Sequence, residues 1–241
     1  FFDFSKKWNF DQKCDYLIFC ATQNLISGKK PTINNFIKSN LTALINALEY
    51  AKKVKLKYFF YLSTITVFGD FDEKILYEDS HIKNPSIYGT SKLFGEHIVK
   101  DYSSYFKTIV LRLPGVVHYQ MPSNRPWLNT IIEKFKNDQD IQVYNKNSLF
   151  NNLIDCKNLK NILLYIINSE EKENFDILNI AARKPIPLID VLNILKDKIG
   201  SKSKIKNVEV KNKSFIISTE KLEKKYNFLP TTTTEILKSI I

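Results

Sequence analysis

The sequence has few cysteines and no long apolar run, and each shortage excludes a class of protein. Its three cysteines, Cys14, Cys20 and Cys156, are odd in number and scattered. We therefore expect reduced thiols, as in the cytoplasm, and no disulfide framework. No apolar run approaches the ~18 residues that a membrane-spanning helix needs, so we expect no membrane partner. The histidines show no ligand spacing, so we expect no metal site.

Arginine is also rare, although the formal net charge is +11. Of the 36 basic residues only three are arginines: Arg112, Arg125 and Arg183. The lysines are spread along the whole chain. Proteins that clamp phosphates or read bases usually depend on arginine, whose planar guanidinium makes paired hydrogen bonds. We therefore interpret the lysines as a solvated surface and expect no nucleic-acid partner. A basic nucleic-acid-associated protein stays as the third of three functional alternatives.

What the sequence does contain is an alternation of strands and helices. Apolar runs near residues 15–20, 56–62 and 107–112 predict buried strands. Helical spacing of apolar residues over roughly 32–53 and 86–103 predicts the helices between them. The alternation predicts right-handed βαβ units and therefore an α/β fold with a parallel sheet between helices. Ligands of such sheets bind at the carboxyl ends of the strands.

The residues after Gly115 follow a less regular pattern. Residues 122–137 predict a loop that leads into a helix, and residues 140–155 predict a small strand pair. Asp155 is the expected N-cap of the next helix, and another strand of the sheet is expected near 175–179.

Gly200 is expected to end a further helix, and a short helix is expected over 218–228. We therefore predict a partial dinucleotide-binding domain over 1–115. A substrate-binding lobe is predicted over 116–241, with segments that return to the first sheet.

The strongest chemical signal is a group of hydroxyls followed by a tyrosine and a lysine. The segment LSTIT, Leu62–Thr66, supplies three hydroxyls just past a strand end. Tyr88 and Lys92 lie four residues apart on a predicted helix and so share a face. A neighbouring ammonium lowers the pKa of a tyrosine, which would let Tyr88 act as acid or base near neutral pH. The combination predicts a proton-transfer site that interconverts an alcohol and a ketone.

Several segments together resemble the extended short-chain dehydrogenase/reductases of the nucleotide-sugar epimerase/dehydratase family. They are CDYLIFCAT, NLTALINALEYAKKVKLKYFFYLSTITVFGD, YGTSKLFGE, IVLRLPGVV, FNNLIDCKNLKNIL, FDILNIAARKPIPLIDVLNIL and STEKLEKKYNFLPTTTTEIL, and they cover nearly the whole chain. The resemblance implies a Rossmann-like parallel sheet flanked by helices and a small C-terminal substrate lobe. It also implies NAD or NADP as cofactor and a nucleotide sugar as substrate.

The resemblance also implies roles for individual residues. Thr64 is the expected catalytic hydroxyl, Tyr88 the acid and base, and Lys92 the lysine that binds the ribose and lowers the pKa of Tyr88. Implied cofactor contacts are Asp3, Cys20, Ala21, Thr22, Asn40, Leu62, Ser63, Pro114 and Gly115. Expected substrate contacts are Thr66, Arg125 and Trp127. Arg125 would act by its charge and Trp127 by stacking, although packing within the lobe explains Trp127 equally well.

Glycine is scarce where the family needs it. The chain has six glycines, and none of them forms the G-x-x-G-x-x-G turn that holds the pyrophosphate in this family. We therefore expect the chain to begin near the third strand of the fold, at Asp3, without the first two βα units. Two explanations stay open: the chain is incomplete, or the gene product has lost its cofactor half. In either case we expect the chain as given to be inactive.

The resemblance narrows the reaction as well. Ile65 and Thr66 stand where the family's dehydratases carry an Asp-Glu pair, and the loop has no cysteine of the kind used for epimerisation beside the ketone. C4 epimerisation and ketone reduction remain, and both need only hydride transfer and the Tyr88 proton. The second functional alternative is a non-catalytic remnant of the family that acts as a binding or scaffold protein.

The family usually pairs two subunits through two helices, which implies a homodimer here. The helices would be those near 32–53 and 86–103. Their outward faces are expected to carry Phe36, Leu44, Leu93 and Phe94, an apolar surface suited to such a contact.

Overall fold

The computed structural model describes residues 3–8, 12–23, 31–118, 126–169, 173–210 and 214–240. Its contacts divide the chain into two compact units. Unit 1 contains residues 1–71, 79–113 and 170–178, and unit 2 contains residues 72–78, 114–169 and 179–241. The segment 170–178 therefore returns from the C-terminal half of the sequence to the first unit.

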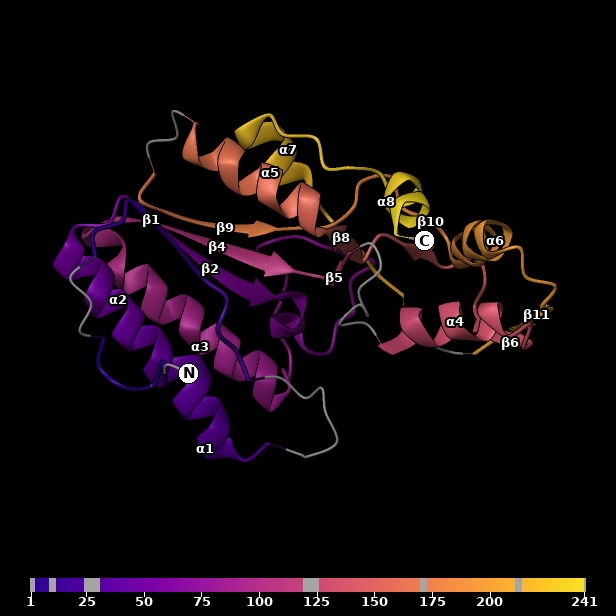
Figure 1. Cartoon of the computed structure of the whole chain (residues 1–241), viewed down its shortest axis with the longest axis horizontal. Coiled ribbons are helices and arrows are strands. Elements are labelled where there is room, and N and C mark those ends of the chain that lie inside the picture. Colours follow the sequence, from indigo (N-terminus) through magenta and orange to yellow (C-terminus); the bar gives the residue numbers. More distant parts are fainter. Residues whose placement is uncertain are drawn as a thin grey trace. The chain divides into compact units, whose positions relative to one another are not determined.

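Unit 1 is built on a four-stranded sheet. The strands lie in the order β1 (Tyr16–Phe19), β2 (Tyr58–Thr64), β4 (Lys107–Leu113) and β9 (Phe175–Asn179). β1 pairs with β2, and β2 with β4, in parallel. Figure 1 shows β9 running in the same direction as β4. The predicted parallel sheet is therefore confirmed.

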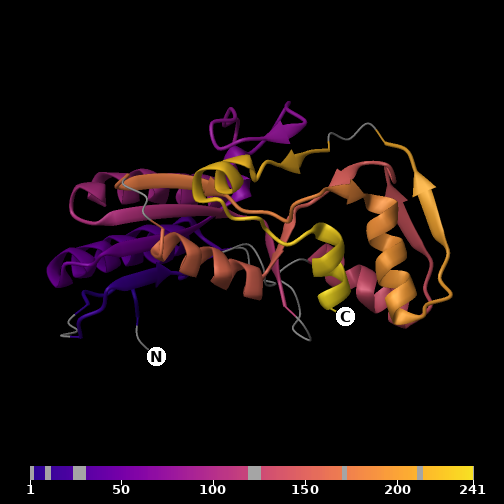
Figure 2. The same ribbon diagram turned by 90° about the horizontal axis from the view of Figure 1, so that it is seen from above.

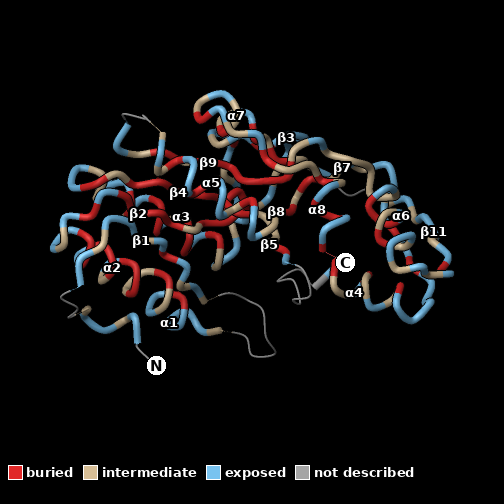
Figure 3. Tube along the Cα trace, turned by 45° about the horizontal axis from the view of Figure 1, so that its top comes forward, coloured by how far each residue is buried: buried red, intermediate tan, exposed pale blue. Residues whose placement is uncertain are grey.

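The central strands are buried because they are apolar along almost their whole length. Every residue of β2 except Leu62 is buried, and every residue of β4 except Lys107. Figure 3 shows this buried centre in red. β1 lies at the edge of the sheet and exposes Tyr16 and Ile18 by 42% and 45%. A strand buried on both faces needs no alternation of polar and apolar residues, so a continuous apolar run is enough to indicate it. The apolar runs near 56–62 and 107–112 therefore predicted β2 and β4.

The first long helix is continuous but changes its winding. It starts at Thr32, whose side chain forms a capping box with Asn35, and comprises α1 (Ile33–Phe36), a π-helical segment η1 (Ile37–Thr42) and α2 (Ala43–Val54). The sequence predicts the start and the length of this helix. Its apolar spacing does not predict the π-helical segment; such segments are rare and are found frequently at functional sites.

The second long helix, α3 (Ile87–Asp101), begins at the N-cap Ser86, which accepts a hydrogen bond from the Gly89 amide. α2 and α3 cover one face of the sheet (Figure 1). α3 approaches β2 closely at Gly95, where a Cβ atom would lie 2.2 Å from the Tyr61 hydroxyl. Only glycine fits at that crossing. Two short 3₁₀ turns, η2 (Ile65–Phe68) and η3 (Tyr102–Ser104), follow β2 and α3.

The predicted outward faces of these helices need a correction. Phe36 and Leu44 lie in the core, with exposed fractions of 2% and 0%, because the helical segment places them toward the sheet and α3. The exposed large apolar side chains of these helices are Ile33, Ile37, Ile45, Ile87 and Phe94. Phe94 is therefore the only one of the four expected residues that is exposed, and Leu93 is half-buried.

Unit 2 is made of helices and short strand pairs. Its elements are β3 (Ile75–Leu76), β5 (Gly115–Val117), α4 (Pro126–Lys136), β6 (Ile141–Tyr144), β7 (Leu149–Phe150), β8 (Leu153–Asp155), α5 (Cys156–Ile167), β10 (Ile186–Pro187), α6 (Leu188–Ile199), β11 (Ile205–Val208), β12 (Ile216–Ile217), α7 (Glu220–Tyr226) and α8 (Thr233–Ser239). None of the helices within the described ranges is long and apolar enough to cross a membrane.

The predicted strand pair within residues 140–155 is wrong. β6 pairs in parallel with β11, and β7 pairs antiparallel with β10. Figure 2 shows β6 and β11 side by side although they lie far apart in the sequence. The apolar pattern indicates strands in this region, but β6 and β7 each pair with a strand that lies later in the sequence. The predicted ends of two helices are confirmed, since Asp155 caps α5 and Gly200 ends α6 with φ +75°.

Candidate active site

The hydroxyls of three residues meet at the carboxyl ends of β1 and β2. Tyr88, in the first turn of α3, shares side-chain hydrogen bonds with Thr22 and Thr64. Thr64 is the last residue of β2, and its Oγ1 lies 3.1 Å from Oγ1 of Thr66 and accepts a hydrogen bond from the Thr66 amide. Thr64 and Tyr88, which the sequence analysis selected as site residues, therefore lie close together in the fold.

The pKa of Tyr88 is raised, which corrects the lowering expected from the Tyr–Lys spacing. Burial is the main cause, because a phenolate loses its hydration in the half-buried site. The hydrogen bonds from Thr22 and Thr64 act in the opposite direction and lower the pKa. The phenol of Tyr88 therefore keeps its proton near neutral pH.

Lys92 is almost fully buried, with 2% of its surface exposed. Its Nζ lies 4.2 Å from the centre of the Tyr61 ring, in the geometry of a cation–π contact. Burial lowers the pKa of Lys92 to about 7, while Glu96 and Cys20 act to raise it. Near neutral pH the amine is thus divided between its charged and neutral forms.

Asn40 holds the chain that leaves β1. It lies in the π-helical segment η1, is 1% exposed, and accepts a hydrogen bond from the Gln23 amide at 2.6 Å. Its Nδ2 donates to Ser91 Oγ on α3 at 2.9 Å and to the Gln23 carbonyl at 3.2 Å. Asn40 therefore ties the segment that contains Thr22 to the helix that carries Tyr88 and Lys92.

Sequence reasoning missed a buried ionic cluster beside these residues. Glu96 accepts a hydrogen bond from Ser63 Oγ at 2.5 Å and pairs with Arg112, whose Nη2 lies 2.8 Å from Oε2. Arg112 also lies 4.8 Å over the Phe68 ring. The available signal was Arg112 itself, since a charged residue inside a buried apolar strand needs a partner.

The remaining residues expected to bind the cofactor are spread over both units. Cys20 follows β1, is exposed, and lies close enough for the Lys92 charge to lower its pKa, although burial raises that pKa overall. Ala21 and Leu62 are half-buried at the ends of β1 and β2. Asp3 contacts Ser5 and Lys38, which hold its pKa at about 2. Pro114 and Gly115 belong to unit 2, where Gly115 opens β5.

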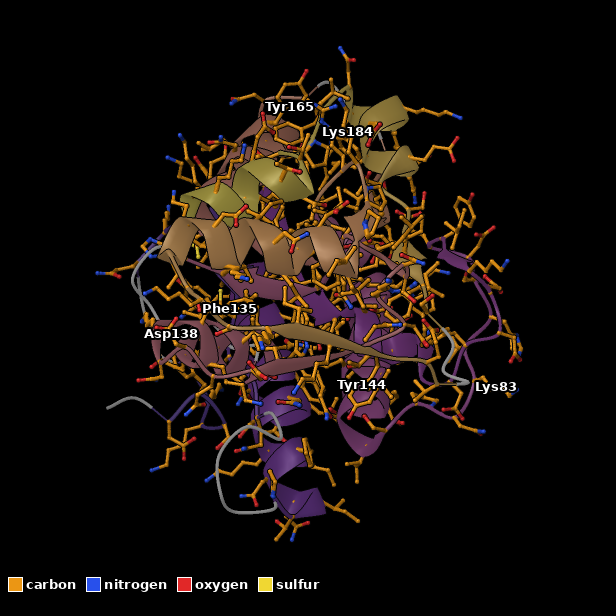
Figure 4. All side chains as sticks on the ribbon, turned by 90° about the vertical axis from the view of Figure 1, so that its right-hand side faces the viewer. Lys83, Phe135, Asp138, Tyr144, Tyr165 and Lys184 are labelled. Atoms are coloured by element: carbon orange, nitrogen blue, oxygen red, sulfur yellow. The ribbon has the colours of Figure 1, made fainter. Side chains whose placement is uncertain are left out.

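Unit 2 contains a cavity of about 520 Å³ with aromatic walls. Trp127 on α4 and Phe150 on β7 lie with their ring centres 5.5 Å apart, and both line the cavity. Tyr144 of β6, labelled in Figure 4, lines it as well and is 52% exposed. Trp127 thus faces a cavity in unit 2, while Arg125 lies outside the described residues.

The part of the chain that the structure describes contains no group of three or more histidine, cysteine, aspartate or glutamate side chains placed to hold a metal ion.

Comparison with known proteins identifies relatives of this arrangement. The chain is 22% identical over 212 residues to the uncharacterised protein MJ1055 of Methanocaldococcus jannaschii, a match that covers 81% of this chain. The chain spans 60% of the length of that relative.

Solved structures share the fold. A UDP-galactose 4-epimerase matches with a TM-score of 0.76 and 21% identity, over 99% of this chain and 80% of that one. RMD from Pseudomonas aeruginosa, complexed with NADPH, matches with a TM-score of 0.80 and 15% identity, over 99% of this chain and 85% of that one. The model of the NAD dependent epimerase/dehydratase family matches residues 6–181, which include β1, β2, α3 and β4. The chain is therefore a member of the NAD dependent epimerase/dehydratase family.

Proposed function

We propose that unit 1 carries the proton-transfer site of an enzyme that oxidises and reduces a nucleotide-activated sugar, by C4 epimerisation or by ketone reduction. The observation that carries the proposal is the hydrogen bonding of Tyr88 to Thr64, one helical turn from the buried Lys92. Ile65 and Thr66 follow Thr64 and offer no carboxyl group, so elimination of water has no acid or base in this segment.

The residues present fit one half of a nicotinamide cofactor, NAD or NADP. The segment Cys20–Thr22, held by Asn40, and the polar end of Lys92 would hold the nicotinamide and its ribose. The glycine turn that binds a pyrophosphate is not among the 241 residues. When bound, the cofactor supplies the acceptor and donor of a hydride.

Tyr88 would move the proton at the sugar oxygen. Because its pKa is raised, it begins as the protonated acid, which suits delivery of a proton to a ketone oxygen. Thr64 would hold the same oxygen by a hydrogen bond. The reverse step needs the phenolate, and Lys92, in its charged form, is the cation one helical turn away that would favour it.

The aromatic cavity of unit 2 supports the proposal that the substrate is recognised through a nucleotide. Trp127, Tyr144 and Phe150 provide flat apolar surfaces on which a base would stack, and Lys134 provides a positive charge beside them. The structural relative named as a UDP-galactose 4-epimerase carries a uridine nucleotide in the name of its substrate. We propose a nucleotide sugar for this chain.

We also propose that two copies pair through α1, η1, α2 and α3. Five exposed apolar side chains on these elements support this: Ile33, Ile37, Ile45, Ile87 and Phe94. Burial of such side chains against a second copy would remove apolar surface from water. Sedimentation should show a dimer at tens of micromolar protein, and Phe94→Asp should shift it toward monomer. A monomer for the unchanged chain would contradict the proposal.

The proposed function is tested by adding the glycine turn that the sequence lacks. The 241-residue chain should bind NAD or NADP no tighter than the millimolar range, ~4 kcal/mol, in calorimetry, because it has no pyrophosphate-binding turn. A chimera that joins the first two βα units of a UDP-galactose 4-epimerase ahead of Asp3 should bind the cofactor more tightly and convert a UDP-sugar. A chimera that binds the cofactor and leaves every UDP-sugar unchanged would favour the non-catalytic alternative.

A further inference from the structure

The buried cluster of Glu96, Ser63 and Arg112, here called the Glu96 cluster, has no part in the proton transfer proposed above. Glu96, Ser63 and Arg112 are 3%, 4% and 3% exposed. Arg112 donates from Nε and from Nη2 to the Glu96 carboxylate, at distances between 2.8 and 3.3 Å. Ser63 donates to the same carboxylate. Burial of two opposite charges is costly, and here the charges are paired and hydrogen-bonded to each other.

The cluster joins α3 to the two central strands, β2 and β4. Ser63 on β2 and Arg112 on β4 are register partners, so both side chains leave the sheet on the same face. Glu96 lies on α3 one turn after Lys92, and its carboxylate meets both strands. These bonds hold the turn of α3 that follows Lys92 against the two central strands.

Tyr61 fixes Lys92 from the sheet side. It is fully buried, its hydroxyl donates to the Lys92 carbonyl at 3.4 Å, and its ring lies under the Lys92 amine. Gly95 allows this close approach of β2 and α3. Packing thus holds the amine over an aromatic ring, with the Glu96 carboxylate as its acidic neighbour on the same helix.

We propose that Glu96 is a positioning residue of the site, whose carboxylate, anchored by Ser63 and Arg112 one helical turn from Lys92, keeps the buried Lys92 amine charged. The catalytic meaning of this role rests on the proposed function, because Lys92 matters there as the cation beside Tyr88. Glu96 is also the larger of the two electrostatic influences that oppose the lowering of the Lys92 pKa by burial.

The other charged and titratable groups near Lys92 have partners or act more weakly. Cys20 at the end of β1 is the second influence on its pKa, and Tyr88 and Tyr61 carry neutral phenols. Lys38 on η1 pairs with Asp3, and Glu49 on α2 accepts a hydrogen bond from Tyr102 near the far end of α3. Glu96 is therefore the group to change.

The test measures the titration of the Lys92 amine directly. The 241-residue chain, labelled with ¹⁵N-lysine, is titrated by NMR, and Lys92→Met assigns the signal. In the unchanged chain the signal should titrate near pH 7. Glu96→Gln should move the midpoint lower by about one pH unit, because it removes the opposite charge and keeps the shape. Glu133→Gln, which removes an exposed carboxylate on α4, should leave it unchanged.

Two further variants keep the proposal testable if Glu96→Gln does not fold. Glu96→Asp keeps the charge but withdraws it by one methylene and should lower the midpoint by less. Glu96→Gln combined with Arg112→Gln removes both charges, and the midpoint should again fall. An unchanged midpoint in any folded Glu96 variant, or a Lys92 signal near pH 10 in the unchanged chain, would overturn the proposal. Since no substrate or cofactor is needed, a chain without turnover could still pass this test.

Discussion

The two units of this chain differ in the charged side chains that they bury. Among the residues that the structure describes, the buried charged side chains all belong to unit 1: Lys92, Glu96, Arg112 and Asp176. The buried polar side chains described in unit 2 are uncharged: Asn151, Asn158, Asn179, Ser203, Thr219 and Thr233. Uncharged amides and hydroxyls need only hydrogen bonds, whereas buried charges need partners and weaken stability when these are lost. The difference supports the proposals that unit 1 carries the proton-transfer site and that unit 2 recognises the substrate.

Asn151 shows how unit 2 uses its buried polar groups. Its Nδ2 donates to the carbonyls of Ala182 and Ile217, and its Oδ1 accepts from the Ile217 amide. One amide side chain thus closes three hydrogen bonds to the backbone of segments that are far apart in sequence. The Asn151 side chain therefore has a structural role, and an amide does not change its charge with pH.

The largest expected effect is on catalysis in unit 1. Tyr88→Phe in the chimera should reduce turnover by about 10²- to 10⁴-fold, because it removes the transferable proton and little else. Tyr16→Phe, on the exposed edge strand β1, is the matched control and should leave turnover unchanged. Steady-state kinetics with a UDP-sugar measure both. Normal turnover in Tyr88→Phe would break the assignment of chemistry to unit 1.

The next effect is on stability and contrasts a buried ion pair with an exposed one. Glu96→Ala should lower the free energy of unfolding by about 3–5 kcal/mol, because Arg112 is left buried without its partner. Glu133→Ala breaks the exposed pair with Lys136 on α4 and should cost far less. Denaturant unfolding followed by circular dichroism compares the two. Equal losses would remove the distinction between the units.

The third effect depends on pH. The folded chain gives up the Lys92 proton near pH 7, and the unfolded chain near pH 10.5, so the unfolded chain binds more protons between these values. This residue therefore weakens the fold most below pH 7, and the penalty fades as the pH rises toward 10.5. Lys92→Met should stabilise the chain by about 3–5 kcal/mol at pH 6 and much less at pH 10. Denaturant unfolding at the two pH values measures this, and a gain independent of pH would contradict the low pKa.

The smallest expected effect is on recognition in unit 2. Trp127→Ala should weaken binding of UDP by about 1–3 kcal/mol, through loss of a stacking surface in the aromatic cavity. In the chimera it should raise KM and leave kcat unchanged, because the chemistry lies elsewhere. Leu164→Ala, at an exposed site on α5, is the control. Undiminished binding of UDP in calorimetry would mean that Trp127 serves the packing of unit 2.

The sequence alone predicted the parts of the fold that depend on local patterns. Apolar runs located β1, β2, β4 and β9, and capping residues such as Thr32, Asp155 and Gly200 located helix ends. The spacing of Tyr88 and Lys92, together with the hydroxyls at the end of β2, indicated where the site lies. These features are readable because strand burial, helix periodicity and capping act over a few residues.

The tertiary structure decided everything that joins distant segments. It paired β6 with β11 and β7 with β10, and it turned Phe36 and Leu44 into the core. It also raised the pKa of Tyr88, lowered that of Lys92, and placed Arg112 against Glu96. Burial and charge pairing depend on which segments meet in space, and residue spacing along one chain does not contain that information.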